Sequence, residues 1–342
     1  MASIKGKLFE YFVFRTLVHC GFSPVVPDGL LVYKGTPGLM VQGLGQPHNA
    51  DVLLSPPIQT PFYYPTRLLV ECKCYNDAIG LPQIRNALGL REDINNFEIV
   101  TEDILKNRKS NRSTKPKYHP MKRYVYQVAV ASIDGFKSTA FPFALAHRIP
   151  LISFSHSALF ANIRDAIDNL DQLAQRNESL GKEISSRISK AMVDPAYYVH
   201  LDAFSFNAWH CYIEEIDSIV RRITIGLLDD GTLLFLLRAM SEEIRFYPVE
   251  EYDDGCSIHW SSVDDSTWAL NDRGTVYYFE LPEKIYKEWL RGESKQKKDA
   301  LRIKQDHFSQ IVLFDRSQNG SPQIRITQLS EEFMSQAELN IQ

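Results

Sequence analysis

Residues 49–55 read NADVLLS and residues 67–75 read RLLVECKCY. Both are short apolar runs of the length expected for β-strands, and the segment between them is rich in proline. Two such runs around a breaker segment are consistent with an antiparallel hairpin. The charged residues within these runs decide what the hairpin can do.

The second run places charge and apolar side chains on opposite faces. Residues i and i+2 of a strand project to the same side, so Glu71 and Lys73 share one face while Cys72 and Cys74 share the other. The Cys-x-Cys spacing lacks the two-residue gap of a zinc knuckle or redox pair. The sequence therefore favours buried apolar thiols beneath a charged face.

The first run contributes a second acid. Alternation places Asp51 away from the face that Ala50, Val52 and Leu54 are expected to share. If the two runs form a hairpin, Asp51 and Glu71 meet at one end of it. Paired carboxylates at a strand end are a candidate site for a hard divalent cation.

The expected chemistry is metal-assisted hydrolysis. The carboxylates of Asp51 and Glu71, with the backbone carbonyl of Cys72, would form an oxygen-rich Mg²⁺ site. The metal would polarise a phosphate and activate a water molecule. Lys73 would position or deprotonate that water and stabilise developing negative charge.

This pattern resembles the PD-(D/E)xK restriction-endonuclease-like superfamily, and within it the Mrr-like branch. The resemblance rests on residues 49–51 (NAD), 70–73 (VECK), 75–77 (YND), 79–80 (IG) and the helix-like stretch 83–90. It covers about residues 1–155. It implies a Mg²⁺-dependent endonuclease, also served by Mn²⁺, that hydrolyses phosphodiester bonds of double-stranded DNA in restriction or another bacterial defence.

The resemblance also implies further site residues. An amphipathic helix predicted at about 4–20 carries Glu10 on the same face as Val13 and Leu17, and the family often takes a glutamate from this helix as an additional catalytic and metal-binding acid. Gln83 begins the helix that follows the lysine strand and could contact the metal-bound water or a phosphate. A solvated first-turn residue remains the alternative for Gln83.

Two other functions are compatible with the same residues. A DNA repair or recombination nuclease, such as a junction resolvase, would use the same site on branched DNA. A non-catalytic DNA- or protein-binding module could retain the fold without the activity, although a scaffold does not require Asp51, Glu71 and Lys73 together.

The surrounding pattern predicts the architecture. Residues 124–155 have a strand–helix–strand rhythm, which implies parallel strands, and helices are expected near 157–175 and 181–193. We expect an α/β restriction-endonuclease-like core, a mixed sheet flanked by helices, in a nuclease-like domain at 1–195. A mainly antiparallel, β-rich (α+β) accessory domain of unknown role would follow at 200–342, with hairpin turns at Asp230-Gly231 and Asn319-Gly320.

Charge is strongly segregated although the formal net charge is only -4. Residues 242–283 contain eleven acidic residues, so this region is a poor DNA reader and a candidate surface for a protein partner. Residues 104–123 contain no acid, and they are either a solvated loop or a loop that contacts DNA phosphates. Their basic residues are Lys106, Arg108, Lys109, Arg112, Lys115, Lys117, Lys122 and Arg123.

Composition sets the remaining expectations. The 342 residues are 44% hydrophobic and 23% charged, the balance of a globular protein with a core. No apolar run approaches the length of a membrane span, and the N-terminus lacks a signal-peptide cleavage site. Five cysteines without a framework favour a reducing compartment, so the cytoplasm is expected. A chain with a single nuclease centre commonly works as a homodimer when both DNA strands are cut, so a homodimer is expected.

Overall fold

The computed structural model describes most of the chain, and the statements below concern its described residues. These are residues 4–29, 31–35, 38–59, 61–96, 124–155, 160–193, 210–240, 252–260, 267–282, 285–286, 297–316 and 320–339. None of the helices within these ranges is long and apolar enough to cross a membrane.

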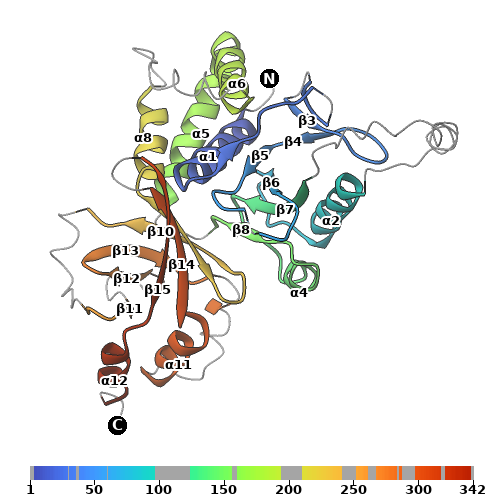
Figure 1. Ribbon diagram of the computed structural model, residues 1–342. Coiled ribbons are helices and arrows are strands. Elements are labelled where there is room, and N and C mark those ends of the chain that lie inside the picture. Colours follow the sequence, from blue (N-terminus) through green and yellow to red (C-terminus); the bar gives the residue numbers. More distant parts are fainter. Residues whose placement is uncertain are drawn as a thin grey trace, which may run out of the picture.

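The N-terminal half is built on a five-stranded mixed sheet in the order β1-β5-β6-β7-β8 (Figure 1). β5 and β6 form the expected antiparallel pair, while β6, β7 and β8 run parallel to one another. The expected mixed α/β sheet is therefore confirmed. Its strands are β1 (Ser23–Pro24), β5 (Val52–Ser55), β6 (Thr66–Lys73), β7 (Val125–Ser132) and β8 (Leu151–Ser153).

Helices cover both faces of this sheet, as Figure 1 shows. One apolar cluster joins one sheet face to α1, α5, α6 and α8, and a second cluster joins the other face to α2 and α4. The expected helices are confirmed at α1, α2, α4, α5 and α6, whereas the sequence did not predict α8. Their bounds are α1 (Lys5–His19), α2 (Leu81–Asn95), α4 (Ala140–Ala146), α5 (Ala161–Arg176), α6 (Glu178–Val193) and α8 (His210–Val220).

Helix α1 is fixed at both ends. Its first N–H groups, those of Ile4 and Lys5, donate hydrogen bonds to Oδ1 of Asp171 on α5, at 2.7 and 3.1 Å. A carboxylate at this end also interacts favourably with the helix dipole. The helix stops at Gly21, whose φ of +98° is the left-handed conformation that glycine adopts readily. These contacts fix the position of α1, and with it that of Glu10, relative to the sheet.

A small antiparallel sheet precedes the hairpin. It consists of β2 (Val32–Lys34), β3 (Leu39–Val41) and β4 (His48–Ala50). The chain bends at Asp51 between β4 and β5. The bend resets the alternation, so the prediction that Ala50 shares a face with Val52 was wrong: the two residues belong to different apolar clusters.

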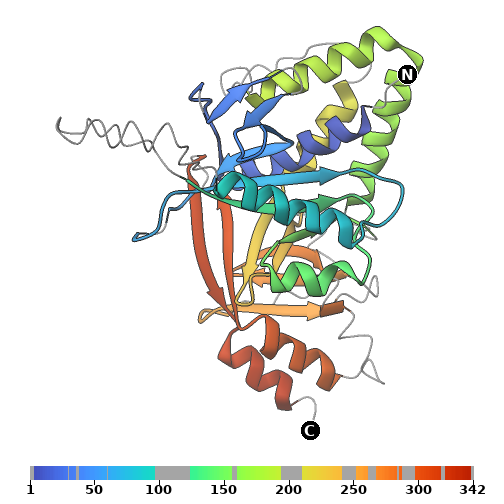
Figure 2. The ribbon, with the colours of Figure 1, turned by 90° about the vertical axis from the view of Figure 1, so that its right-hand side faces the viewer.

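The C-terminal half forms a seven-stranded antiparallel sheet that curves into a half-barrel (Figures 1 and 2). The predicted hairpin between β9 and β10 is confirmed, with Gly231 at φ +83°, and β14 pairs with β15 as expected across Gly320. Its strands are β9 (Ile223–Leu228), β10 (Leu233–Arg238), β11 (Cys256–Trp260), β12 (Thr267–Asp272), β13 (Thr275–Glu280), β14 (Gln310–Arg316) and β15 (Pro322–Gln328), and its helices are α11 (Lys297–His307) and α12 (Glu331–Leu339).

The two halves share one apolar cluster that runs from α1 and β6 through α8 to β9 and β10. Polar contacts cross between them as well. Arg15 on α1 and Asp217 on α8 form an ion pair at 3.2 Å, and both residues are buried. Arg316 on β14 donates a hydrogen bond of 2.8 Å to the carbonyl of Val18. The β-rich half is therefore packed directly on the helix that carries Glu10.

Candidate active site

Asp51 and Glu71 lie opposite each other at the end of the hairpin. Val52 pairs with Val70, so Asp51, one residue earlier, falls at the position facing Glu71. The N–H of Cys72 donates a hydrogen bond of 2.9 Å to Oδ2 of Asp51, which fixes the orientation of that carboxylate. The hairpin thus brings together the two acids that the sequence placed on separate strands.

Lys73 bridges the two acids. Its Nζ lies 2.7 Å from Oε2 of Glu71 and 3.7 Å from Oδ2 of Asp51. Burial alone lowers the pKa of this amine, but the nearby Glu71 and Asp51 carboxylates outweigh burial, so the pKa of Lys73 is raised. Lys73 therefore stays protonated at neutral pH and acts as a cation in this site.

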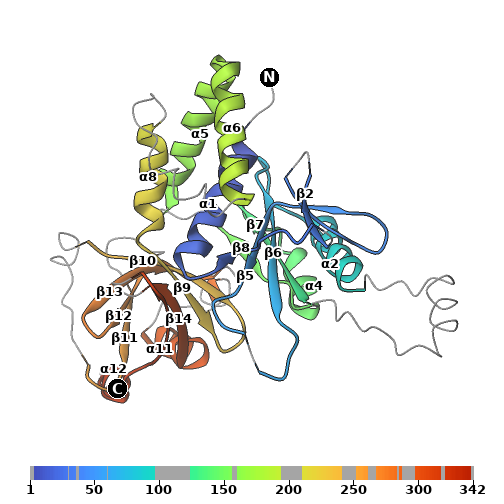
Figure 3. The same cartoon turned by 45° about the horizontal axis from the view of Figure 1, so that its top comes forward.

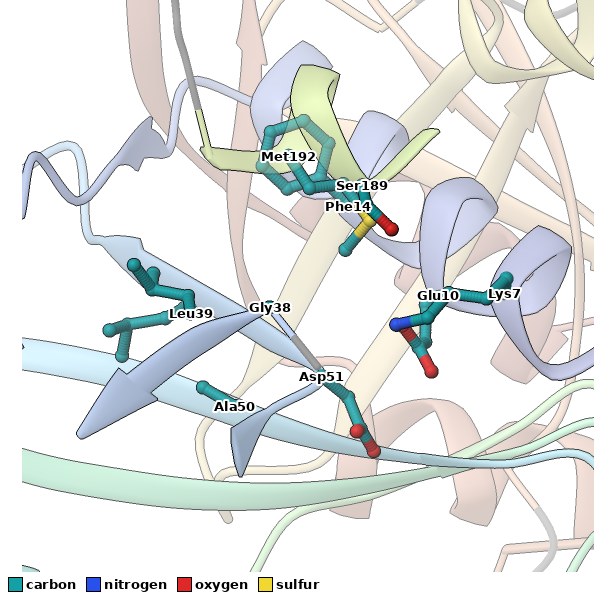
Figure 4. Close-up of a pocket in the computed structure, with 10 residues that line it drawn as sticks. Lys7, Glu10, Phe14, Gly38, Leu39, Ala50, Asp51, Ser189 and Met192 are labelled. Carbon is teal, nitrogen blue, oxygen red and sulfur yellow. The ribbon is translucent and has the colours of Figure 1, made fainter. Parts of the chain in front are cut away.

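Glu10 approaches Asp51 from the other side. Figure 4 shows Glu10, on α1, and Asp51, at the bend after β4, lining the same pocket with Phe14 and Met192. The pocket has room for about one water molecule. Lys7 forms an ion pair of 2.6 Å with Glu10 from one turn earlier on the same helix. The carboxylate of Glu10 is therefore partly neutralised before any ligand arrives.

Asp51 is the common neighbour of both other acids. Burial, followed by the charge of Asp51, raises the pKa of Glu10 and also that of Glu71. Within the described part of the chain, no three His, Cys, Asp or Glu side chains gather closely enough to form a metal cluster. The arrangement is two carboxylate pairs that share Asp51, each accompanied by a lysine.

The cysteines lie where strand alternation placed them. Cys72 and Cys74 pack with Val70 against the apolar cluster beneath α1. Burial raises the pKa of Cys74 to about 12 and holds that of Cys72 well above its usual range. Both therefore behave as apolar thiols, not thiolate ligands.

Gln83 lies in the first turn of α2, as expected, but it makes no hydrogen bond to Asp51, Glu71 or Lys73 in the structure. Its buried Oε1 accepts no hydrogen bond from any described residue. Ser132 is 1% exposed and pairs with Lys73 across β6 and β7, and its hydroxyl is likewise without a hydrogen-bond partner among the described residues. Sequence reasoning did not single out Ser132, because its proximity to Lys73 depends on the parallel register.

His48, on β4, forms a side-chain contact with Asp93. Its Nε2 lies 2.5 Å from Oδ2 of Asp93 on α2, and Oδ1 of Asp93 accepts a hydrogen bond of 3.0 Å from the N–H of Gly45. The hydrogen bond to His48 lowers the pKa of Asp93. This contact ties the β3–β4 turn to α2.

The expected DNA-contacting loop lies outside the described residues, since residues 97–123 are not described. This range includes all the basic residues proposed for that role. Much of the acidic segment 242–283 is also outside the described ranges. Both interpretations stay predictions from the sequence.

Comparisons with known proteins add little to this geometry. No protein-family model matches the chain, and no curated protein matches it. Among solved structures, the crystal structure of a protein of unknown function, AF1548, aligns with 54% of this chain and 97% of its own, with 13% identity and a TM-score of 0.29. Such a TM-score carries no argument about fold or function.

The raised pKa of Glu10 gives a prediction for stability. A carboxyl whose pKa is higher in the folded state binds its proton more tightly there, so the free energy of unfolding falls as pH rises above the ordinary value of 4.5. Glu10→Gln removes this penalty. In EDTA at pH 7.5 we expect the melting temperature to rise by about 1–2 °C, the size of a fraction of a kcal/mol.

The pH dependence provides the control for this effect. At pH 4, where Glu10 is protonated in both states, the same exchange should leave the melting temperature unchanged or lower it slightly. Thermal unfolding followed by circular dichroism at both pH values measures the difference. A variant less stable than wild type at pH 7.5 would show that the ion pair with Lys7 outweighs burial.

Proposed function

We propose that this protein is a Mg²⁺-dependent endonuclease that hydrolyses phosphodiester bonds in double-stranded DNA. The observation that carries the proposal is the convergence of Asp51, Glu71 and Lys73 at one end of the β5–β6 hairpin. The same acids and lysine, on an antiparallel hairpin followed by a helix and a parallel strand, are what the PD-(D/E)xK resemblance implies.

The donor set suits a hard divalent cation. The carboxylates of Asp51, Glu71 and Glu10 each keep one oxygen that takes part in no hydrogen bond or ion pair with a described residue. Burial, and after it the charge of Asp51, raises the pKa of both glutamates, and a bound cation would offset the second of these effects. The carboxylates of Asp51 and Glu71 and the backbone carbonyl of Cys72 would bind the ion. Glu10, which lines the same pocket as Asp51, would add a third carboxylate beside them.

The chain's own residues then divide the work. A bound Mg²⁺ supplies Lewis-acid polarisation of the phosphate and a more acidic water. Lys73, kept protonated by its two acids, stabilises the charge that develops on the phosphate oxygens. The N–H of Cys72 holds Asp51 in place throughout.

Asp51→Asn tests this proposal. The exchange keeps the side-chain size and the hydrogen bond from Cys72, but it removes the charge that both glutamates share as a neighbour. We expect Mg²⁺ binding, measured by calorimetry, and nicking of supercoiled plasmid to fall together, with nicking reduced at least about 100-fold. Asp165→Asn is the matched control, since Asp165 is exposed on α5 and lies outside the motif.

The outcomes separate the alternative functions. Unchanged nicking by Asp51→Asn would remove the site assignment. Faster cleavage of a four-way junction than of linear duplex would favour the repair or recombination nuclease. Mg²⁺ binding without nicking of any DNA by wild type would favour the non-catalytic module. A role in restriction or bacterial defence follows from the resemblance. A cytoplasmic location, inferred from the cysteine usage, and a homodimer that cuts both strands belong to the same proposal.

A further inference from the structure

The connection between β5 and β6 exposes consecutive aromatic side chains. Relative exposure is 105% for Phe62, 77% for Tyr63 and 65% for Tyr64, so these rings pack on almost nothing. Figure 3 shows the connection projecting beyond the sheet. Scattered exposed apolar residues are ordinary, but three successive rings on a projecting tip indicate a contact surface. We call residues 56–65 the aromatic loop.

The aromatic loop is closed at its base. The side-chain amide of Gln59 accepts a hydrogen bond of 2.7 Å from the N–H of Thr66 and donates one of 3.1 Å to the Thr66 carbonyl. Prolines restrict the backbone on both sides of the tip. Phe62 itself has φ +69°, a left-handed conformation that is costly for an aromatic residue and is often retained at functional sites. The restrained loop backbone therefore holds the three rings in a defined, solvent-exposed position.

The aromatic loop is anchored beside a basic part of the sequence. The N–H of Val125, at the start of β7, donates a hydrogen bond of 2.9 Å to the carbonyl of Pro65. The guanidinium of Arg67 lies 3.6 Å from the ring centroid of Tyr124 at the same place. Lys122 and Arg123 directly precede Tyr124 in the sequence. Arg67 itself is 6% exposed, so the described residues offer a nucleic acid base stacking on the exposed rings and not a phosphate contact from this guanidinium.

The loop and the candidate active site are opposite ends of one hairpin. β6 runs from Thr66, at the base of the loop, to Lys73, in the site. Eight strand residues span roughly 23 Å at about 3.3 Å each. This distance equals roughly seven nucleotides at about 3.4 Å per nucleotide. A nucleic acid bound at Lys73 would have to extend by about this length, around the helices that cover the faces of the sheet, to meet the rings.

We propose that Phe62, Tyr63 and Tyr64 form a stacking surface for unpaired bases of the nucleic acid cut at the carboxylate site, an inference that rests on the proposed function. Every base has a face that stacks on an aromatic ring, so the surface would bind single-stranded arms or unpaired regions without sequence preference. The loop itself carries no charged residue. A loop built for an anionic membrane would pair its rings with its own lysine or arginine.

The test compares two DNA ligands in EDTA, where no cleavage complicates binding. One is a labelled blunt duplex, and the other is the same duplex with a single-stranded arm of about 12 nucleotides, within the range of known single-strand sites. Fluorescence anisotropy with the full chain should give at least about tenfold tighter binding to the armed duplex, since stacking contributes about 1–3 kcal/mol per base. The triple variant Phe62→Ser, Tyr63→Ser and Tyr64→Ser should lose this preference and bind the blunt duplex as wild type does.

Ile58→Ser is the matched control, because Ile58 is 59% exposed in the same loop but offers no ring. Equal melting temperatures for all variants confirm that folding is intact. No preference by wild type, or an unchanged preference in the triple variant, overturns the inference. The inference is also overturned if the triple variant loses binding to phosphatidylserine vesicles while its binding to both DNA ligands equals that of wild type. If wild type prefers the armed duplex but does not nick DNA in Mg²⁺, the proposed cleavage is rejected and the stacking surface is retained.

Discussion

Lys73→Met is expected to lower plasmid nicking at least about 100-fold, the range lost when a charged group in the transition state is removed. Methionine keeps the length and the apolar stem of lysine but removes the ammonium that lies 2.7 Å from Glu71 and 3.7 Å from Asp51. The acids then lose their internal cation. Mg²⁺ should consequently bind more tightly to the variant than to wild type.

Opposite changes in metal affinity and activity are the signature of this site. A misfolded variant would lose both, whereas a lysine that only neutralises the acids would be replaced by Mg²⁺ without loss of cleavage. Calorimetry and a plasmid-nicking time course on the same preparation separate these cases. Lys34→Met is the control, since Lys34 is exposed on β2. Wild-type nicking by Lys73→Met would contradict the assigned role.

Asp217→Ala is expected to lower the free energy of unfolding by about 3–5 kcal/mol, the usual cost of removing one partner of a buried ion pair. Arg15 and Asp217 are each 6% exposed, and their contact joins α1 to α8 across the two halves. Removing Asp217 takes away the carboxylate that lies 3.2 Å from the buried guanidinium of Arg15. Urea unfolding monitored by fluorescence measures the loss, with Asp165→Ala on the exposed side of α5 as the control.

A second variant distinguishes the charge from the packing. Arg15→Met combined with Asp217→Val removes both charges and nearly keeps the combined volume, and it should recover most of the lost stability. Because α1 also carries Glu10, nicking by Asp217→Ala should fall while nicking by the double variant recovers. Equal stability of Asp217→Ala and wild type would show that Arg15 is satisfied without this partner.

Local patterns in the sequence were sufficient for the centre of the site. Strand alternation has a fixed period of two, so it placed Glu71 with Lys73 and buried Cys72 without knowledge of the rest of the fold. The facing of Asp51 and Glu71 needed one further fact, the hairpin register, which the apolar pattern also favoured.

Long-range contacts account for what the sequence did not reveal. The bend at Asp51 exists because β4 pairs with β3 in a separate sheet, and no local signal marks that division. His48 meets Asp93 across 45 positions, and the apolar cluster of α1 extends to β9 and β10 in the other half. Pairings at such separations depend on tertiary packing, which periodicity does not encode.

The position of Asp51 between two sheets makes the candidate site adjustable. Glu71 and Lys73, its partners, lie on the five-stranded sheet. Ala50, the residue before Asp51, pairs with Leu39 in the three-stranded sheet. A ligand that pulled on the small sheet would move one carboxylate relative to the other acid and leave the Glu71–Lys73 pair intact. Under the proposed function, variants in the loops of the small sheet are expected to change Mg²⁺ affinity and cleavage while Asp51, Glu71 and Lys73 are kept.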